Sequence, residues 1–441
     1  MNDKLNILIY ITHDSGRHFG CYGNPTVSTP NVDRMAAEGV RFSNHFCTSP
    51  GCSPSRGSIF TGRYPHSIGL TGLANWKWGW RLNPDERHMA AILHDAGYES
   101  ALFGAQHEID PTNWPDFAAE LGYERHATTV GGAIPLEPIF IEALRERAAH
   151  PSGRPFFYSV ATGETHRPVF RPNYPYPHDD PDKVWVPPYL PDLPEVRSDI
   201  AAFHSLFKAA DHFIGEILNA LDETGLSEDT LFIYTTDHGI PYPRAKMSLY
   251  DPGLETALVM RGPQGFRGGK VFPQLLSNID LLPTILEAAG VAVPERVQGR
   301  SFLPLVQGGA HAPRGEIFGE KTYHARYDPM RCVRTERLKY IRNWKLDEPL
   351  EMYDWLEAHP ERTEFRDYFA ASHPPEELYD LEKDRWEQTN RAGSAEYAGV
   401  LQDLRARVTR FMQDTDDPLL KGKPPYPRVG KTHPAQEYYE E

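Results

Sequence analysis

The chain has 441 residues, which is enough for a large hydrophobic core and a second, smaller domain. Its 61 acidic and 46 basic residues give a formal net charge of −15, which argues against nucleic acid or a membrane as the main partner because both need a basic face. The acidity also weighs against a long polyanionic substrate, whereas a small anion in a locally basic pocket remains compatible with it.

Cysteine content and the first residues of the chain predict a compartment. The four cysteines, one of which belongs to a motif described below, make a poor disulfide framework and suit a reducing environment. Residues 1–4 lead directly into an apolar run, without the successive basic, apolar and cleavable segments of a signal peptide. No apolar run reaches transmembrane length. We therefore expect a cytoplasmic protein, although a chain whose signal peptide had been removed would look the same.

Up to residue 315, strand patterns alternate with helix patterns. Apolar runs predict strands at Leu5–Thr12, Tyr98–Phe103, Pro155–Val160 and Thr230–Thr235. Apolar spacing and glycine stops predict helices at Asn31–Gly39, Glu86–Ala96, Ser198–Glu223 and Asp280–Ala289. Residues 170–194, dense in proline, tyrosine and aspartate, predict an ordered loop over the site. This alternation predicts the α/β class, with a doubly wound, mostly parallel sheet in a catalytic domain of residues 1–315.

The pattern changes in residues 316–441. The segments Arg331–Trp344 and Glu376–Leu381 are typical of strands joined by turns, and Tyr397–Thr415 is typical of a closing helix. We expect a smaller C-terminal antiparallel α+β domain here. Its acidic, proline-rich tail after Asp416 is expected to wrap the surface.

Two polar pairs follow predicted parallel strands. His13-Asp14 comes after the first strand, and Asp237-His238 comes after the strand at Thr230–Thr235. Because the carboxyl ends of parallel strands meet at one edge of a sheet, we expect these four side chains to lie together. A single histidine is more often a satisfied core residue, but two carboxylates and two imidazoles in this arrangement indicate a divalent metal site.

A cysteine stands at a predicted helix start. Ser53, Pro54 and Ser55 favour a first helical turn, which places Cys52 over unsatisfied backbone N–H groups and the positive end of the helix dipole. With Arg56 one turn later, this thiol is either a nucleophile with a lowered pKa or an ordinary buried cysteine.

The residues around this cysteine carry a family resemblance. The run Cys52-x-Pro54-Ser55-Arg56, followed by Thr61-Gly62-Arg63, resembles the signature of type I sulfatases. In that family a formylglycine-generating enzyme oxidises the cysteine to formylglycine, whose hydrate attacks sulfur and later expels sulfate. The resemblance implies an alkaline-phosphatase-like fold, with Cys52 as the precursor of the nucleophile and Arg56 as the cation that holds it.

The resemblance also implies a ligand set for one divalent ion, in which the residue derived from Cys52 joins His13, Asp14, Asp237 and His238. Calcium is the usual ion of the family. However, sulfatases usually have two aspartates where this chain has His13-Asp14. A nitrogen donor in place of a carboxylate weakens the argument for calcium, so manganese or another transition ion is also compatible.

Three more groups match sulfatase positions. By resemblance, His107 handles the formylglycine hydroxyl, while His166 and Lys246 contact sulfate and assist the leaving group. On its own, a histidine is more often a satisfied core residue, and Lys246 is more often a surface lysine. The chain departs from the family at Ala105, where sulfatases usually have a lysine that binds sulfate. Either Gln106 or another basic residue replaces that cation, or the substrate differs.

Several segments resemble the sulfamidases, the N-sulfoglucosamine sulfohydrolases of heparan degradation. They are Val186–Pro191, Gly239–Pro243, Ser248–Gly253 and Asp328–Arg331. If the likeness extends to the substrate, His324, Met330 and Arg331 approach the sugar from the second domain. Trp76, Trp78 and Trp80 then line the entrance, or else pack against the domain.

The expected function is hydrolysis of sulfate from a sulfated amino sugar such as glucosamine N-sulfate, presented as a small sugar or oligosaccharide. The alternatives are an O-sulfatase acting on a sugar or small sulfate ester, or a phosphonate monoester hydrolase or phosphodiesterase of the same superfamily. A degenerate binding protein is the non-enzymatic alternative, since His13 and Ala105 depart from the family pattern. An oligomer is compatible with all of these.

Overall fold

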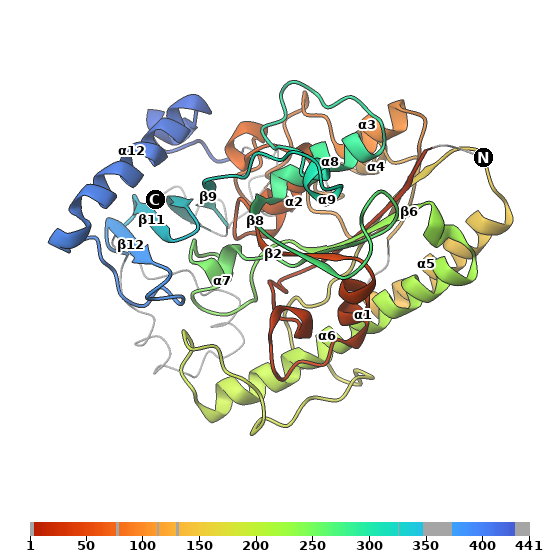
Figure 1. The fold of residues 1–441 in the computed structure, drawn as a ribbon, viewed down its shortest axis with the longest axis horizontal. Coiled ribbons are helices and arrows are strands. Elements are labelled where there is room, and N and C mark those ends of the chain that lie inside the picture. Colours follow the sequence, from red (N-terminus) through yellow and green to blue (C-terminus); the bar gives the residue numbers. More distant parts are fainter. Residues whose placement is uncertain are drawn as a thin grey trace.

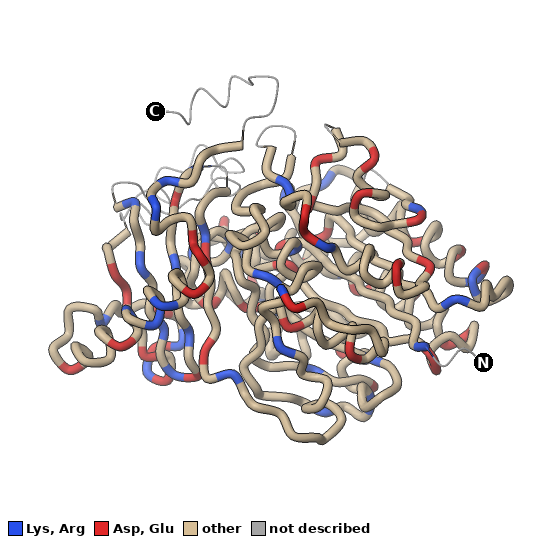
Figure 2. The backbone as a smooth tube through the Cα atoms, turned by 90° about the horizontal axis from the view of Figure 1, so that it is seen from above, with Lys and Arg blue, Asp and Glu red and all other residues tan. Residues whose placement is uncertain are grey.

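The computed structural model describes residues 4–75, 79–112, 114–128, 132–324, 326–346 and 373–427. It contains an eight-stranded sheet and a four-stranded sheet, with helices packed on both (Figure 1). Acidic and basic residues are interspersed along the fold (Figure 2). No helix among these residues is both long and apolar enough to cross a membrane.

The large sheet has the strand order β4-β3-β5-β1-β6-β7-β2-β8. All neighbouring strands are parallel except β7, which runs antiparallel to β6 and β2. The central pair, β1 and β6, is in a register that sets Thr12 beside Thr236. The strands are β1 (Asn6–Thr12), β2 (Val40–Phe46), β3 (Glu99–Gly104), β4 (Arg125–Ala127), β5 (Phe156–Ala161), β6 (Thr230–Thr236), β7 (Leu258–Arg261) and β8 (Lys270–Ser277).

Helices cover both faces of this sheet. Alternate side chains of β1 enter two cores, so that Tyr10 packs with one group of helices and Ile9 with the other. The first group is α1 (Pro30–Glu38), α5 (Ala133–Ala149) and α6 (Pro194–Glu223). The second is α2 (Cys52–Thr61), α3 (Met89–Asp95), α4 (Phe117–Leu121), α8 (Leu281–Ala288) and α9 (Leu303–Val306). The two groups lie on opposite sides of the sheet (Figure 1), which confirms the doubly wound architecture.

The small sheet is antiparallel, with the order β12-β11-β10-β9. Its strands are β9 (Ile317–Tyr323), β10 (Tyr327–Arg334), β11 (Leu338–Asn343) and β12 (Glu376–Asp380). The helix α12 (Ala398–Asp414) packs on it through Leu404, Val408 and Phe411, which share one apolar cluster with Val333 and Tyr340. The C-terminal α+β unit is therefore confirmed. The division into domains at residue 315 stays a prediction, and the new sheet begins at Ile317.

Short elements complete the fold. The four-residue helix α7 (Asp251–Leu254) follows the second polar strand end. Within the described residues, turns of 3-10 helix occur at Gly20–Tyr22, Pro65–Ile68, Leu226–Glu228, Asn278–Asp280, Ala395–Tyr397 and Pro418–Lys421. Residues 162–193 contain no helix or strand, which agrees with the predicted ordered loop. The predicted tail beyond residue 427 lies outside the described residues.

Candidate active site

The cysteine begins helix α2, as the local sequence predicts. Gly51 caps the helix in an extended conformation, and its carbonyl accepts the first helical hydrogen bond from the Ser55 N–H (3.0 Å). All ten residues of α2 are buried, so this helix forms a fixed part of the site. The Cys52 Sγ lies 3.3 Å from Nε2 of His238 and 3.9 Å from Oδ1 of Asp14.

The helix start does not make Cys52 an acidic thiol. Burial raises the pKa of its thiol well above the ordinary value, with a further rise from Asp14 and Asp237 and only a partial opposing effect from Lys246. This direction favours the ordinary buried cysteine over a thiolate nucleophile with a lowered pKa, because burial outweighs the helix dipole.

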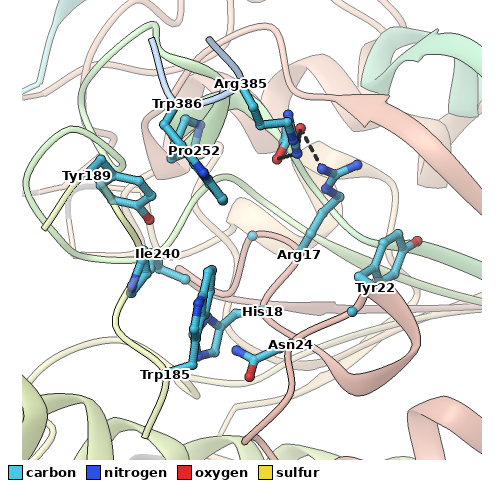
Figure 3. A pocket seen from close by; sticks show the side chains of 14 residues that line it. Arg17, His18, Tyr22, Asn24, Trp185, Tyr189, Ile240, Pro252, Arg385 and Trp386 are labelled. Carbon is cyan, nitrogen blue, oxygen red and sulfur yellow. Dashed lines mark hydrogen bonds and ion pairs between the residues drawn. The ribbon is translucent and has the colours of Figure 1, made fainter. Parts of the chain in front are cut away.

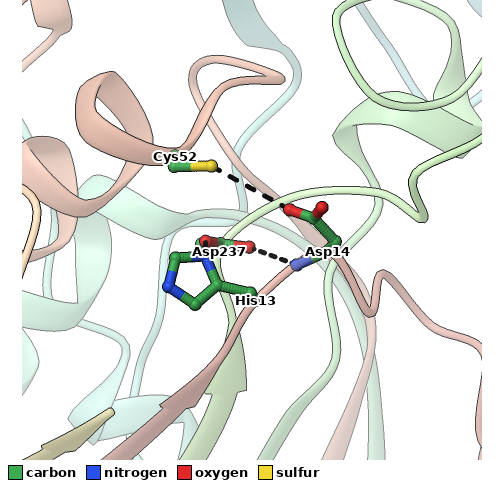
Figure 4. Close-up of side chains that lie close together, drawn as sticks. All are labelled: His13, Asp14, Cys52 and Asp237. Carbon is green, nitrogen blue, oxygen red and sulfur yellow. Dashed lines mark hydrogen bonds and ion pairs between the residues drawn. The ribbon is translucent and has the colours of Figure 1, made fainter. Parts of the chain in front are cut away.

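The two polar strand ends meet beside this cysteine. Parallel pairing of β1 with β6 brings Asp14 and Asp237 together, and the Asp14 N–H donates to Asp237 Oδ1 (2.9 Å). The His13 Nδ1 lies 3.2 Å from Asp237 Oδ2, and the His238 Nε2 lies 3.2 Å from Asp14 Oδ1. One ligand atom each from His13, Asp14, Cys52 and Asp237 lies within 4.8 Å of all the others (Figure 4). All of these side chains are buried.

The chemistry of this cluster fits a divalent cation. Burial raises the pKa of Asp14, but Lys246, His166 and His238 lower it, and the net value is below the ordinary one. Burial lowers the pKa of His13 to about 4, so its imidazole is neutral at pH 7 and has a lone pair available. Ionised carboxylates and neutral imidazoles are ligands for both calcium and manganese sites, with nitrogen favouring the latter.

Two cations border the cluster on different sides. The buried Arg56 donates from Nε to Asp237 Oδ2 (3.1 Å), and its Nη2 has no hydrogen-bond partner among the described residues. The Lys246 Nζ donates to Asp14 Oδ2 (2.9 Å) and lies 3.4 Å from the Nε2 of His166. Positive charge thus reaches the cluster from the α2 side and from the His166 side.

Two further histidines complete the surroundings. The ring of His107 meets the edge of His13 with a centroid distance of 4.7 Å, and burial, with His13 and Arg56 adding to it, keeps the pKa of His107 well below its ordinary value. The His166 side chain is 40% exposed, whereas Cys52, Arg56 and Lys246 are buried. The structure therefore brings together Cys52, Arg56, His107, His166 and Lys246 with the four strand-end residues.

The position of the missing lysine is not filled by Gln106. Its Oε1 accepts from the N–H groups of Glu108 (2.9 Å) and Ile109 (3.0 Å), and its Nε2 donates to the Ile109 carbonyl. The amide is thus used inside its own turn. The neighbouring Glu108, which was not predicted from the sequence, is a buried carboxylate that accepts from the His107 N–H (3.0 Å). Its place after the strand at Tyr98–Phe103 is the signal that would have drawn attention to it.

Comparison with known proteins decides the family. A family model described as Sulfatase matches residues 6–291 of the chain, and one described as N-sulphoglucosamine sulphohydrolase, C-terminal, matches residues 242–374. The chain belongs to the sulfatase family. This sulfatase is a hydrolase that acts on sulfate esters, and its family implies a metal ion and formylglycine, with which the buried His, Asp and Cys cluster is consistent.

Individual relatives cover nearly the whole sulfatase chain. It is 31% identical to an ulvan-active sulfatase of Formosa agariphila, covering 95% of this chain and 82% of that protein. It is 27% identical to the human N-sulphoglucosamine sulphohydrolase, covering 94% and 91%. Its fold resembles the solved phosphonate monoester hydrolase of Silicibacter pomeroyi, with a TM-score of 0.72 at 21% identity over 94% of this chain and 96% of that one.

Of the residues predicted to approach the substrate from the second domain, His324 reaches the sulfatase site. Its Cδ2 lies 3.5 Å from the position that a Cβ on Gly51 would occupy, beside the start of α2. Tryptophan 80 is 7% exposed and packs on Tyr323 with a centroid distance of 5.0 Å, which supports the packing alternative. Trp76 and Trp78 lie outside the described residues.

Met330 and Arg331 do not have the surroundings of substrate-binding groups. Met330 belongs to a buried apolar cluster. Arg331 is fully buried, and its guanidinium donates to Asp417 (2.6 and 3.0 Å), to Thr322 Oγ1 (3.0 Å) and to the Lys321 carbonyl (2.8 Å). The predicted sugar contacts of Met330 and Arg331 are therefore wrong, because both side chains make their contacts inside the C-terminal sheet and its connections.

Proposed function

We propose that this sulfatase removes sulfate from a sulfated amino sugar such as glucosamine N-sulfate. The observation that carries the proposal is the match of residues 242–374 to the N-sulphoglucosamine sulphohydrolase C-terminal model. This region contains His324, which lies next to the start of α2. The human relative named for that reaction covers 94% of the chain and supports the same substrate class.

In this proposal Cys52 is the precursor of formylglycine, made by a formylglycine-generating enzyme. Formylglycine supplies a hydrated aldehyde as nucleophile, and a divalent ion supplies a Lewis acid. His13, Asp14, Asp237 and His238 would hold the ion. Calcium follows the family pattern, and the imidazole donors keep manganese as the alternative.

Arg56 and Lys246 bind and orient the anionic reacting group. The Arg56 Nε is fixed by Asp237, which leaves the unpartnered Nη2 as a preorganised donor next to Cys52. The Lys246 Nζ, held by Asp14, provides charge on the His166 side. Other sulfatases usually have an additional sulfate-binding lysine at the position of Ala105. In this chain Arg56 and Lys246 bind the sulfate without it.

His166 protonates the departing nitrogen or oxygen. Its Nδ1 lies 2.7 Å from the Arg167 carbonyl, which accepts a hydrogen bond and therefore fixes a proton on Nδ1. The Nε2 faces Lys246 and carries the transferable proton only in the imidazolium form. The open side of this ring is where a leaving group can sit, because Cys52, Arg56 and Lys246 are buried.

An O-sulfate ester of a sugar is the second candidate. The ulvan-active sulfatase of Formosa agariphila has the higher identity of the two relatives described, 31% against 27%. The same residues would act in both reactions, and the difference lies in whether His166 protonates an amine or an alkoxide.

The test uses protein coexpressed with a formylglycine-generating enzyme, with conversion of Cys52 checked by peptide mass. Glucosamine N-sulfate, glucosamine 6-sulfate and a phenyl phosphonate ester are each incubated with it, and released sulfate or phenol is quantified. Preferential release from glucosamine N-sulfate is the expected result. Preference for glucosamine 6-sulfate would replace the proposal by the O-sulfatase alternative, and preference for the phosphonate would contradict both.

A further inference from the structure

A second cavity, separate from the metal cluster, lies on the α6 side of the same sheet edge. It has a volume of about 260 Å³ and is lined by segments far apart in the chain, 16–24, 185–189, 240–255 and 385–386 (Figure 3). Ligand pockets for drug-sized molecules begin at about 300 Å³, so this cavity suits a smaller molecule such as one sugar ring. It contains none of the predicted catalytic residues.

Aromatic side chains form one side of the cavity. The rings of Trp185 and Trp386 lie 6.1 Å apart, and Tyr189 lies 5.6 Å from Trp386. The two tryptophans are half-buried, and the ring of His18 lies 6.3 Å from Trp185. Such faces, apolar across the ring and polar at the edge, suit the C–H face of a sugar.

A buried amide supplies an unused donor. The Asn24 Oδ1 accepts from the N–H groups of Thr26 (2.9 Å) and Val27 (3.1 Å), which fixes the orientation of the amide. The side chain is buried, and its Nδ2 has no hydrogen-bond partner among the described residues. In Figure 3 this nitrogen points toward Trp185 and His18. A buried donor of this kind needs an acceptor such as a sugar hydroxyl.

Two arginines on the opposite side share one carboxylate. The Arg17 Nη2 lies 2.6 Å from Glu255, and the Arg385 Nη2 donates to both Glu255 oxygens (2.9 and 3.2 Å). The Arg385 Nη1 lies 3.6 Å from Asp251, beyond hydrogen-bond length, and that aspartate already receives Lys339 (2.9 Å). The Arg17 Nη1 donates to the Ser43 carbonyl. Two guanidinium groups that share the Glu255 carboxylate leave positive charge at the cavity, in a chain whose net charge is −15.

We infer that this cavity is a second carbohydrate site, which binds one sugar unit bearing a sulfate or carboxylate group. The aromatic side takes the ring, Asn24 takes a hydroxyl, and Arg17 with Arg385 takes the acidic group. The inference rests on the proposed function for its choice of an acidic sugar as the ligand class. Gly16 and Ile240 in its wall follow Asp14 and His238 closely in the chain, so the cavity lies near the strand ends that carry the metal cluster.

The experiment uses full-length Cys52→Ala protein, which cannot turn over substrate, titrated calorimetrically with glucosamine N-sulfate. Two binding events are expected. Adding Trp386→Ala should weaken one of them at least tenfold, and adding Lys246→Ala should weaken the other. Trp114→Ala is the matched control, since this half-buried tryptophan stacks with Arg81 and does not line the cavity.

A second variant guards against misfolding at Trp386. Asn24→Asp keeps the acceptor for Thr26 and Val27 but removes the donor, and it should weaken the same event. A single event unchanged by either variant would overturn the inference. Equal affinity for uncharged N-acetylglucosamine would overturn the acidic-group assignment. Absence of sulfate release by wild-type enzyme, with the Trp386-dependent event intact, would reject the proposed function and leave the second site standing.

Discussion

Two fully buried arginines, Arg56 and Arg331, show how differently the same side chain is used in this protein. Both pair with an aspartate, Asp237 for the first and Asp417 for the second. The guanidinium of Arg331 donates to a carboxylate, a hydroxyl and backbone carbonyls, so that all three of its nitrogens have acceptors. Arg56, one turn after Cys52, has a buried Nη2 without a hydrogen-bond partner among the described residues. Burial alone therefore does not identify a functional arginine, and the unpartnered Nη2 distinguishes Arg56 from Arg331.

The largest expected effect is the loss of turnover on substitution of Cys52. Cys52→Ala removes the precursor of the nucleophile, so turnover should fall on the order of 10⁴-fold or more. The thermal midpoint should change little, because alanine at the first position of α2 keeps the helix. Sulfate release by the variant at near wild-type rate would show that Cys52 is not that precursor. Cys21→Ala, at a half-buried position away from the cluster, is the control.

Substitution of Arg56 tests the arginine that has the unpartnered Nη2. Arg56→Gln should lower kcat by about 10²–10³-fold, the loss typical of removing one preorganised donor to a charge that develops during reaction. The stoichiometry of bound metal, measured by atomic emission, should stay unchanged, since none of the predicted ligand atoms comes from Arg56. If kcat were unchanged while stability fell, the two arginines would belong to the same structural class.

Arg331→Gln should have the opposite profile. Removing one partner of a buried pair leaves an uncompensated carboxylate, and unfolding free energy should fall by about 3–5 kcal/mol. The kcat of the folded fraction should remain close to wild type, measured by active-site titration alongside urea unfolding. Restoring part of the stability with Asp417→Asn in the same chain would locate the cost in the unpaired charge. A kcat loss as large as that of Arg56→Gln would reinstate the predicted substrate contact.

At neutral pH the smallest expected effect concerns buried imidazoles, which, unlike arginines, lose their charge on burial. His88 begins α3, its Nδ1 accepts from the Ala90 N–H, and burial lowers its pKa from 6.5 to about 3. Between these values the unfolded chain binds the proton and the folded chain does not, so stability falls as pH drops from 6.5 toward 3. At about 1.4 kcal/mol per pKa unit, the loss reaches a few kcal/mol.

His88→Asn keeps an acceptor at this helix start and removes the titrating ring. Its unfolding free energy, followed by urea melts from pH 7 to pH 4, should depend less on pH than that of wild type. An unchanged slope would assign the acid sensitivity to other groups.

The strand-end site was predictable because polar residues directly follow apolar runs in the sequence, and the carboxyl ends of parallel strands meet at one edge of a sheet. Two clearly apolar strands precede the four residues His13, Asp14, Asp237 and His238, and parallel pairing of these strands brings the residues together. Arg331 was assigned wrongly because residue type and a segment resemblance do not reveal acceptors as remote as Asp417. The cavity lined by Trp185 and Trp386 was not predicted for the same reason, since these residues are 201 positions apart in the sequence and meet only in the folded chain.

Elements with weak local signals were also missed. β2 alternates buried and half-buried residues and includes Arg41, Ser43, Asn44 and His45, and β7 has only four residues. Helix α5 contains Pro138, which normally argues against a helix interior. In these segments tertiary packing, such as that of Phe140 against Phe103 and Tyr158, outweighs local preference.

The complete burial of α2 sets an order of events during synthesis. A second enzyme that oxidises Cys52 must take the surrounding segment into its own catalytic cleft. In the folded protein the thiol is 3% exposed, and every residue of the helix behind it is covered. If Cys52 is converted to formylglycine as proposed, the conversion takes place after this segment is synthesised and before the helix packs. The speed at which the domain folds would then limit the fraction of molecules that become active.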